Sequence, residues 1–563
     1  MNRRDFIKLN GLIAAAPGFA APNFEPSAGK PLADDFRLEP VDLLGRIRLG
    51  QNALLGGLSS RRHLPYWTCS FKNGDLAGFH YSTYQGEGVW DQMHNVGRAL
   101  HGLSLAESVT GELVSAAIFD DLADQTMDLF RDGDGLPGGK EAMTGRRIVN
   151  LHNIRETLNG LTALIKRGYR EAEPLARRMV RVIRKSLGDD GRIHLDRLPV
   201  KVDGYNHQPS MEGRALDALV RYYRISHDDV ALETAALITE FALAHCFSEA
   251  GALTWAAGTH GHSINAMVAG MIDFALTTHD DVLLARARRA YDVGLPSFNS
   301  SFGWSMESLH KPRLRGEANN TGDLLRATLL LGSAGFPDYF GRAERILRSH
   351  LLPSQVVDVK AYSNDSKTAE DHLRNLATRI RGGFSFPTPN DLQFQPDAGI
   401  FTYDIVSGVV DALCETYRAI VHEDANGARI NLLLSVESER LSIKSLLPER
   451  GCMIVTNRSP SNVWMRLPAW VRPADVSVQT NGSGTAPRFV GKYLFLSDAM
   501  DPHGSTVNFP IREERTVEHI VYQPFTIDWK GDQIVAMSPP AVNVSRDQAP
   551  LPEPCLPMFP VIR

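Results

Sequence analysis

The chain has 563 residues, of which 43% are hydrophobic and 22% charged, with a net charge of −5. This length and composition allow more than one hydrophobic core, and the slightly acidic balance without a basic run argues against nucleic-acid binding. No segment reaches the roughly 20 consecutive apolar residues that a membrane span requires. Five cysteines (Cys69, Cys246, Cys414, Cys452 and Cys555) form no Cys-x-x-Cys pair, which argues against a disulfide framework and a thiolate zinc site.

Residues 1–21 carry the pattern of a twin-arginine export signal. The sequence Asn2-Arg3-Arg4-Asp5-Phe6-Ile7-Lys8 precedes a weakly hydrophobic run and a stretch of small residues that ends at Ala21. Paired arginines, Phe and Lys in this order are typical of such a signal. We therefore expect a periplasmic or secreted protein.

After a first helix-like stretch and a Gly- and aromatic-rich passage from Tyr66 to Trp90, helical periodicity dominates to about residue 422. Apolar residues recur at i, i+3, i+4 and i+7, as in Leu158, Leu161, Leu164 and Ile165. The pattern predicts a first helix over 38–60 and a last one over 402–421, with five helix pairs between them. These pairs are 94–109 with 113–131, 152–168 with 170–187, 209–225 with 229–246, 263–279 with 281–294, and 319–334 with 338–352.

Polar, catalysis-capable residues cluster at the start of one helix in each pair. With Asp91, His152, His207, His260 and Asn320 as markers, the intervals are 61, 55, 53 and 60 residues. A ring of helical hairpins would bring such helix starts to one mouth. We therefore expect a mainly α fold, an (α/α)6 toroid or barrel over residues 22–425, with its site at that mouth.

The period changes from 3.6 to 2 near residue 428. Runs such as 430–436, 440–444, 452–456 and 463–467, continued to residue 521, predict short antiparallel strands with turns such as Asn481-Gly482. They indicate an antiparallel β-sandwich over residues 426–537. The Pro-rich segment 538–563 is expected to form an extended strap.

Three motifs resemble the six-hairpin (α/α)6 glycosidase superfamily, and within it the β-L-arabinofuranosidase-like group, glycoside hydrolase family 127 and its relatives. Trp464 to Trp470, followed by Val476 to Gly482, is similar to the group's "LRIPxW" strand and "VxVNG" hairpin. Glu317 to Asp323 resembles its "YNETCA" helix opening, and Val507 to Ile511 its "LxLPM" strand. The resemblance implies an α-ring followed by a β-sandwich and a sugar substrate.

The group's cysteine chemistry has no counterpart in this sequence. Its mechanism uses a zinc-bound cysteine nucleophile, with a Cys-Cys pair that opens a late barrel helix. Here that helix opens Gly399-Ile400-Phe401-Thr402-Tyr403-Asp404, and Asn320-Thr321-Gly322 replaces Glu-Thr-Cys. We therefore expect no metal and no cofactor from the resemblance.

Glycosidic hydrolysis usually needs two carboxylates, one of them an acid with a raised pKa. Glu212 is the predicted acid, and Asp91 or Asp323 its partner. The alternatives are that Glu212 only interacts with the helix dipole and that Asp91 only caps its helix. Trp90 would stack on a sugar ring beside Asp91.

The remaining candidates are histidines, amides and arginines at the same openings. We expect His207 and His260 to take part in catalysis, and the substrate to be bound by further residues: Trp90, His94, His152, Arg155, Arg214, His262, Glu317, Asn319, Asn320 and Tyr403. His260-Gly261-His262 could also ligate a metal, although His-x-His alone is a weak signal.

Three functions remain open. The favoured one is an exported glycoside hydrolase acting on a polysaccharide or oligosaccharide, exo-acting, on a uronic acid or pentose residue. Arg155 and Arg214 could instead neutralise a uronate carboxylate in a polysaccharide lyase, with His207, His260, Tyr205 or Tyr403 as the base. A non-catalytic sugar-binding protein is the third reading. The sequence does not specify the oligomeric state.

Overall fold

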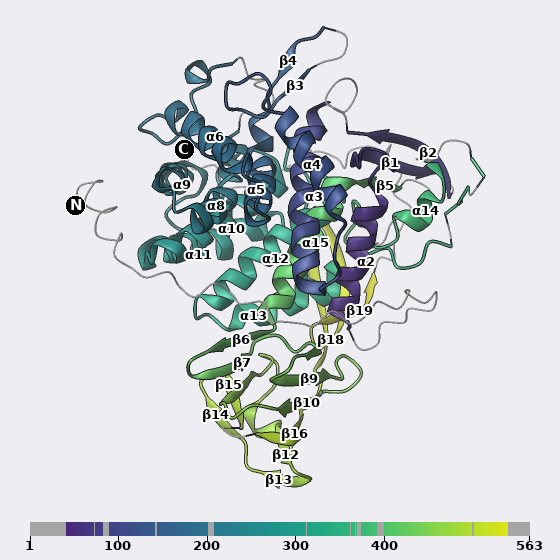
Figure 1. The fold of residues 1–563 in the computed structure, drawn as a ribbon. Coiled ribbons are helices and arrows are strands. Elements are labelled where there is room, and N and C mark those ends of the chain that lie inside the picture. Colours follow the sequence, from purple (N-terminus) through teal and green to yellow (C-terminus); the bar gives the residue numbers. More distant parts are fainter. Residues whose placement is uncertain are drawn as a thin grey trace.

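The computed structural model describes residues 41–538 apart from residues 73, 83–88, 141–143, 201–207, 311, 361, 366, 369–372, 391–398 and 498–499, and without the side chains of residues 89–92, 399 and 502 (Figure 1). The predicted signal, the predicted strap beyond Ser538, and His207 lie outside the described residues. Trp90 and Asp91 lie in a described helix, but their side chains are outside the description.

Within the described residues, six inner helices form a closed ring. In order around the ring they are α3 (Val89–Thr110), α5 (Ile154–Lys166), α8 (Leu216–Ser226), α10 (Gly261–Thr278), α12 (Ala318–Ser333) and α15 (Tyr403–Ala419). Each packs against the next, and α15 packs against α3. An outer layer of the described chain comprises α2 (Leu43–Gly56), α4 (Ala116–Asp128), α6 (Ala172–Ser186), α9 (Asp229–Phe241), α11 (Asp281–Arg289) and α13 (Asp338–Ile346).

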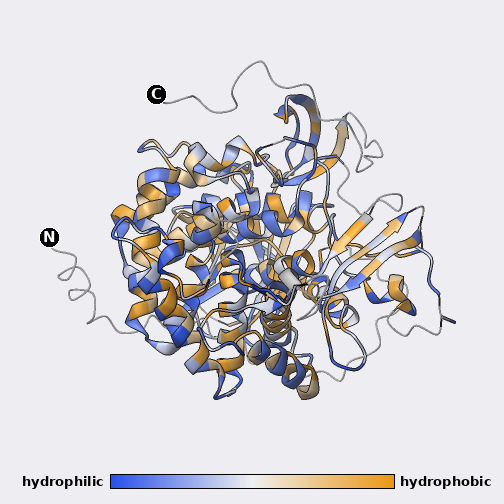
Figure 2. Ribbon diagram, turned by 90° about the horizontal axis from the view of Figure 1, so that it is seen from above, coloured by the Kyte–Doolittle hydropathy of each residue, from blue (hydrophilic) through white to orange (hydrophobic). Residues whose placement is uncertain are grey.

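The two helix layers follow from their sequences. The helices carry both hydrophilic and hydrophobic stretches (Figure 2), and in α6 the buried side is formed by residues such as Ala176, Met179, Val180 and Ile183. Apolar residues at this spacing lie on one side of a helix, so an outer helix packs on the ring while its charged side faces water. The inner helix α5 is buried along most of its length.

The same four-residue sequence, His-Asp-Asp-Val, spans the connection from α8 to α9 and the one from α10 to α11. His227 and His279 end the inner helices in the left-handed conformation, each with φ of 53°. Asp228 and Asp280 then cap the outer helices, because their carboxylates accept hydrogen bonds from Val230 N and Leu283 N. Two hairpins of the ring are therefore closed by one local sequence.

The predicted helical ring followed by a β domain is confirmed, with local differences. The predicted helix 209–225 is broken at Arg214 and Ala215 into α7 (Pro209–Gly213) and α8. The C-terminal ends of the predicted helices 229–246, 281–294 and 338–352 are single π-helical turns, at Ala242–Cys246, Ala290–Gly294 and Leu347–Leu351. Hydrophobic periodicity does not distinguish these turns from α-helix.

Short elements lie beside the ring. The hairpin β1 (Tyr66–Lys72) and β2 (Asp75–Tyr81) extends through β1 to β5 (Gly399–Thr402), so that Thr68 pairs with Thr402. Because β5 leads directly into α15, this sheet fixes the start of that helix. The other short elements are β3 (Gly139–Lys140), β4 (Arg147–Ile148) and α14 (Leu376–Arg379).

Two sheets with their own apolar core form the β-sandwich. One has the order β13-β12-β16-β10-β9-β8 and the other β14-β15-β11-β7-β6 among the described strands. Their bounds are β6 (Val421–Asp424), β7 (Gly427–Ile430), β8 (Val436–Glu437), β9 (Leu441–Ser445), β10 (Cys452–Asn457), β11 (Val463–Arg466), β12 (Ser477–Thr480), β13 (Ser483–Thr485), β14 (Arg488–Val490), β15 (Tyr493–Ser497) and β16 (Asp501–Asn508). The pair β7–β11 is parallel, in contrast to the expected antiparallel pattern.

The last three strands do not belong to this sandwich, although the sequence assigns them to it. β17 (Glu513–Ile520), β18 (Gln523–Lys530) and β19 (Gln533–Ser538) form a separate antiparallel sheet. Its buried side chains, including Phe525 and Trp529, pack in the same core as the barrel helices. Alternation of apolar residues predicts these strands but not which core they join.

Buried charges tie the sandwich to α13. Glu344 accepts hydrogen bonds from Leu433 N (2.8 Å) and from the guanidinium of Arg466, and Arg348 Nη2 donates to Leu433 O (2.8 Å). Trp470 Nε1 donates to Asp532 Oδ2 at 3.0 Å. Two side chains of the motif from Trp464 to Trp470 thus bind residues outside the sandwich: Arg466 binds Glu344 on α13, and Trp470 binds Asp532 between β18 and β19. None of the helices in the described part is long and apolar enough to cross a bilayer.

A tight contact between α3 and α5 yields a stability prediction. A Cβ on Gly97 would lie 2.1 Å from Glu156 O, and one on Gly160 would lie 2.8 Å from Gly97 Cα. Gly97→Ala should therefore force the helices apart, lower the unfolding free energy by about 1–3 kcal/mol or more, and lower Tm. In the control Gly341→Ala, the new Cβ makes only an ordinary 3.4 Å contact. The control should leave Tm unchanged or raise it, because Ala favours helix by about 1 kcal/mol. Equal Tm values for both variants would contradict the prediction.

Candidate functional site

The starts of the inner helices bring a line of histidines together. His94 comes from α3, His152 from the 3-10 turn before α5, and His260 and His262 from the start of α10. Ring centroids lie 5.2 Å apart for His94 and His152, 5.8 Å for His152 and His260, and 5.7 Å for His260 and His262. Residues 168 positions apart in the sequence therefore share one mouth, as the helix-start clusters predict.

Glu156 is the centre of a buried ion cluster in this mouth. Arg214 Nη2 donates to Glu156 Oε1 at 2.6 Å, and Arg98 Nη2 lies 3.2 Å from the same oxygen. Burial alone would raise the pKa of Glu156, but Arg214, His94 and Arg98 hold it well below its ordinary value. Arg214 also contacts His152 Nε2. Burial and the charge of Arg214 keep the pKa of His152 well below its usual range, so this imidazole is neutral.

Asp323 is held by a bidentate arginine. Arg155 Nη1 and Nη2 donate to its two oxygens at 2.9 and 2.5 Å, while Arg155 Nε donates to Asp217 at 3.0 Å. His262 Nε2 lies 2.9 Å from Asp323 Oδ2. Despite burial, Arg155 and His262 hold the pKa of Asp323 well below its ordinary value. Asp323 is therefore an ionised carboxylate that orients His262.

Asp404 is a partly exposed carboxylate in the mouth, with 18% of its side chain accessible. It lies in the first turn of α15, where β5 places it, and its Oδ2 is 3.5 Å from His94 Nε2. Burial raises its pKa, but the hydrogen bond and charge of His94 and the charge of Arg98 hold it below its ordinary value. Asp404 is thus ionised and open to a ligand.

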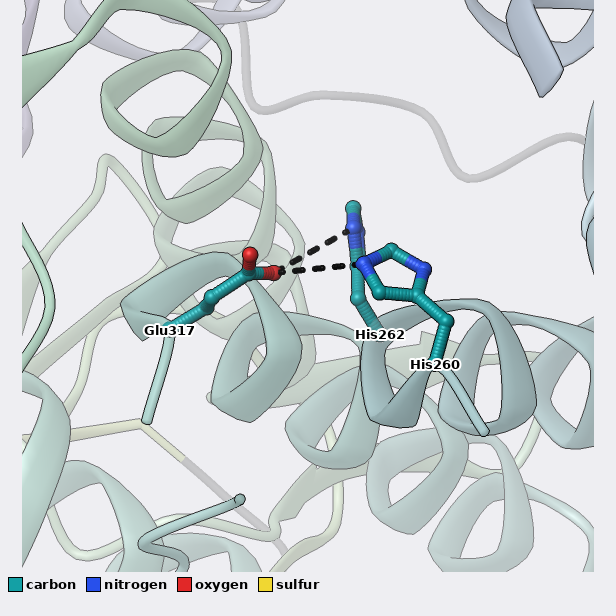
Figure 3. Close-up of side chains that lie close together, drawn as sticks. All are labelled: His260, His262 and Glu317. Carbon is teal, nitrogen blue, oxygen red and sulfur yellow. Dashed lines mark ion pairs between the residues drawn. The ribbon is translucent and has the colours of Figure 1, made fainter. Parts of the chain in front are cut away.

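His260, His262 and Glu317 point toward one another (Figure 3). Glu317 Oε2 lies 3.8 Å from His262 Nδ1 and 4.0 Å from His260 Nε2. Burial, followed by the charges of Glu307 and Asp404, raises the pKa of Glu317 well above its ordinary value. Burial and neighbouring groups lower the pKa of His260 well below its usual range and that of His262 to about 4.

The backbone positions these three side chains at adjacent helix starts. His260 and Glu317 are the residues before α10 and α12, which pack side by side. Gly261 N donates to Glu307 O at 3.0 Å, and Ala318 N donates to Ser385 O at 3.2 Å. Both helix starts are thereby anchored to neighbouring chain segments.

Several predicted site residues have other partners. Glu212, the predicted acid, accepts a hydrogen bond from Ile193 N at 3.0 Å and lies 3.7 Å from Arg192. Both contacts direct the Glu212 side chain to the loop after α6. Tyr403 is buried and donates to Leu54 O at 3.1 Å, and Asn320 bonds Met306 O and Asn265 within the packing of α10 and α12. The contacts of these three side chains lie within the packing of the fold, and their predicted roles at the site remain predictions.

The two predicted arginines also have protein partners. All three nitrogens of the Arg155 guanidinium donate to Asp217 or Asp323, and Arg214 is fully buried against Glu156 and His152. Neither is available to bind a substrate carboxylate. Asn319 remains beside the site, with Nδ2 3.4 Å from His262 Nδ1.

Two site residues are not among those predicted from sequence: Asp404, which is one of six carboxylates at the helix starts but not chosen for a role, and Arg98. Asp404 was visible as a carboxylate in the first turn of the predicted last helix, which is the signal that could have identified it. Arg98 lies one turn after His94 on α3, so helical spacing could have placed both on one side of the helix.

The cysteine-bound zinc of the resembled group does not fit these residues. At the helix openings where that group has cysteines, this chain has Asn320-Thr321-Gly322 and Tyr403-Asp404, so these openings offer no thiolate. Cys414 is buried, and burial raises the pKa of its thiol far above the ordinary value, so it is not a ready thiolate.

Two solved structures share this architecture. A β-arabinofuranosidase of glycoside hydrolase family 127 is 14% identical, with 87% of this chain and 79% of that chain covered and a TM-score of 0.56. A family 127 β-L-arabinofuranosidase from Geobacillus stearothermophilus T6 is 13% identical, with 87% and 80% covered and a TM-score of 0.54. No family model and no curated protein matches the sequence. The likeness shows that the chain shares their fold, an (α/α)6 ring with a β domain.

Arg155 gives a prediction about stability. Arg155→Met would leave Asp217 and Asp323 buried without one of their cations, so the unfolding free energy of the barrel should fall by about 3–5 kcal/mol. Tm measured by circular dichroism should drop accordingly. The control Arg472→Met removes an arginine that pairs with Asp475 at the surface, and its Tm should not change measurably. A wild-type Tm for Arg155→Met would show that the buried pair contributes nothing.

Proposed function

We propose that this protein is an exported glycoside hydrolase whose site is the mouth of the six-hairpin ring. The observation that carries the proposal is Asp404. It is an ionised, partly exposed carboxylate that lies beside His94, and its charge acts on Glu317 and His260. Glycosidase sites place catalytic groups on two sides of the scissile bond. The mouth offers two such groups, Asp404 beside His94 and the His260–His262–Glu317 cluster, which is near enough for the charge of Asp404 to act on Glu317.

Asp404 and the cluster have different roles in the reaction. Asp404 acts at the anomeric carbon, either as the nucleophile or as the base that takes a proton from the attacking water. The bond between the anomeric carbon and the glycosidic oxygen breaks, and Glu317, which lies against His260 and His262 and has a raised pKa, donates a proton to the departing oxygen. Water supplies the hydroxyl that the anomeric carbon finally carries. His94 and Arg98 orient Asp404 and keep it ionised.

The substrate we infer is a neutral sugar at the end of a chain. The uronic acid option loses support because Arg155 and Arg214 are bound to protein carboxylates. The two similar structures are named for β-arabinofuranosides, so a pentofuranoside is the first class to test. The motif over residues 1–21 supports export to the periplasm or beyond.

Asp404→Asn tests the proposal. The variant keeps the shape of the side chain but cannot act as nucleophile or base, so kcat/KM on aryl pentofuranosides should fall by about 10²–10⁴-fold. The matched control is Asp281→Asn, another first-turn aspartate but on the outer helix α11, which should retain wild-type activity. Unchanged turnover by Asp404→Asn on a hydrolysed substrate would exclude this role.

The same digests separate hydrolysis from elimination. New reducing ends without an increase in ultraviolet absorbance are expected, because elimination alone creates a conjugated double bond in a uronic acid. A rise in absorbance on uronate-containing polysaccharides would favour the lyase. Sugar binding without either product would favour a non-catalytic protein.

His94 gives a prediction about pH. Since His94 contributes to the lowered pKa of Asp404, His94→Gln should raise that pKa and move the acid limb of the kcat/KM profile to higher pH. A variant that merely disturbs packing would lower activity at every pH without moving the limb. His63→Gln, which removes a similar His–Asp contact near Asp121 outside the mouth, should leave the profile unchanged.

A further inference from the structure

We propose that His260, His262 and Glu317 bind one first-row divalent cation, and that their donor set favours Zn²⁺. Two imidazole nitrogens and one carboxylate oxygen lie within 4.8 Å of one another and point to a common centre (Figure 3). Two histidines and one glutamate are a known ligand set of catalytic zinc sites. The ion-binding site is inferred from the geometry of these three residues. Only the role of the ion in the reaction rests on the proposed function.

The hydrogen-bond partners of His260 allow a lone pair to face Glu317. The Ser263 hydroxyl lies 2.8 Å from His260 Nδ1 and 3.0 Å from Met211 Sδ. With this hydroxyl donating to Met211, His260 Nδ1 donates to Ser263 Oγ, and Nε2 presents a lone pair to Glu317 Oε2 at 4.0 Å.

His262 carries its proton on the other ring nitrogen, Nε2, and its free nitrogen also faces Glu317. Its Nε2 lies 2.9 Å from Asp323 Oδ2, which is an acceptor only because Arg155 keeps that carboxylate ionised. Asn319 Nδ2 donates toward Nδ1 at 3.4 Å. The proton of His262 thus lies on Nε2, and Nδ1 presents a lone pair to Glu317 Oε2 at 3.8 Å.

Two imidazole nitrogens and one carboxyl group face a single centre, which holds either a proton on Glu317 or a cation that displaces it. The contacts behind the two histidines match those behind metal-binding histidines, whose second nitrogen donates to a carboxylate or another acceptor. Bonds of about 2.0–2.2 Å would bring Glu317 Oε2 several tenths of an ångström closer to each histidine nitrogen than the present 4.0 and 3.8 Å.

One side of the cluster is open. The His260 and Glu317 side chains are 23% and 12% accessible, whereas that of His262 is 3% accessible. Structural zinc sites are closed by four protein ligands, while catalytic ones keep a position for water or substrate. A cation here would have that open position on the side of the mouth, where it could bind a sugar oxygen as a Lewis acid.

Titration with Co²⁺ tests the site without any sugar. Full-length protein without an affinity tag is first treated with a chelator, and CoCl₂ is added while the visible absorption of bound Co²⁺ is followed. One equivalent should bind with saturation, compete with Zn²⁺, and raise Tm as expected for a ligand of the folded state. Failure to detect saturable binding overturns the proposal.

Variants locate the bound ion. His260→Ala, His262→Ala and Glu317→Gln should each abolish the Co²⁺ spectrum while retaining the wild-type circular dichroism. Ser263→Ala keeps all three ligands but removes the acceptor that orients His260, and it should weaken binding about 10–100-fold. The control His194→Ala, from an exposed His–Asp pair with Asp190, should bind as wild type. Binding that is unaffected by the three ligand variants overturns the proposal.

The two proposals fail separately. Protein that binds Co²⁺ through these residues but hydrolyses no glycoside contradicts the proposed function and leaves the ion site in place. Protein that hydrolyses glycosides through Asp404 and binds no ion contradicts the ion site alone.

Discussion

A network of buried charges inside the helix ring is the constraint on which the rest of the structure depends. Arg155 joins α5 to Asp217 on α8 and Asp323 on α12, and Arg326 joins α12 to Asp217, to Asp273 on α10 and to Glu415 on α15. Arg221 adds contacts from α8 to Asp411 on α15, which also binds His101 on α3. Buried ions are stable only when each is paired, so this network fixes how the six inner helices are arranged.

The same network positions the site. Arg155 holds Asp323, and Asp323 fixes the tautomer and direction of His262. On the other side Arg214 holds Glu156 and contacts His152, while Arg98 extends from Glu156 toward His262 at 3.5 Å. Each carboxylate that is saturated by arginine serves packing or orientation. Asp404 and Glu317 are the carboxylates with partial exposure, so they are the ones that can contact a substrate. The clusters at the helix starts therefore have two roles, one in packing and orientation and one in the reaction.

The helical ring could be predicted from sequence because its pattern is local. Apolar spacing gave the helix pairs, and the recurrence of polar residues at helix starts gave one shared mouth. The roles of the polar residues could not be predicted in the same way. Glu212 and Asp404 both lie in the first turn of their helices, yet one is bonded to Ile193 N and the other faces His94. That difference depends on the loop after α6 and on the pairing of β5 with β1, both of which are contacts between distant segments.

The start of α12 differs from the motif that it resembles in which residue faces the mouth. The position of the resembled group's glutamate holds Asn320, which now bonds Asn265 and Met306 O and contributes to the contact between α10 and α12. Glu317, three residues earlier, faces the mouth in its place, and its two nitrogen neighbours come from α10 rather than from the opening of α15. The opening of α15 contributes Asp404 where the group has cysteine. In the proposed site, a ligand set of histidines and a carboxylate next to a separate ionised carboxylate lies at helix openings where the resembled group has thiolates, which agrees with the rule that one fold can carry different chemistries.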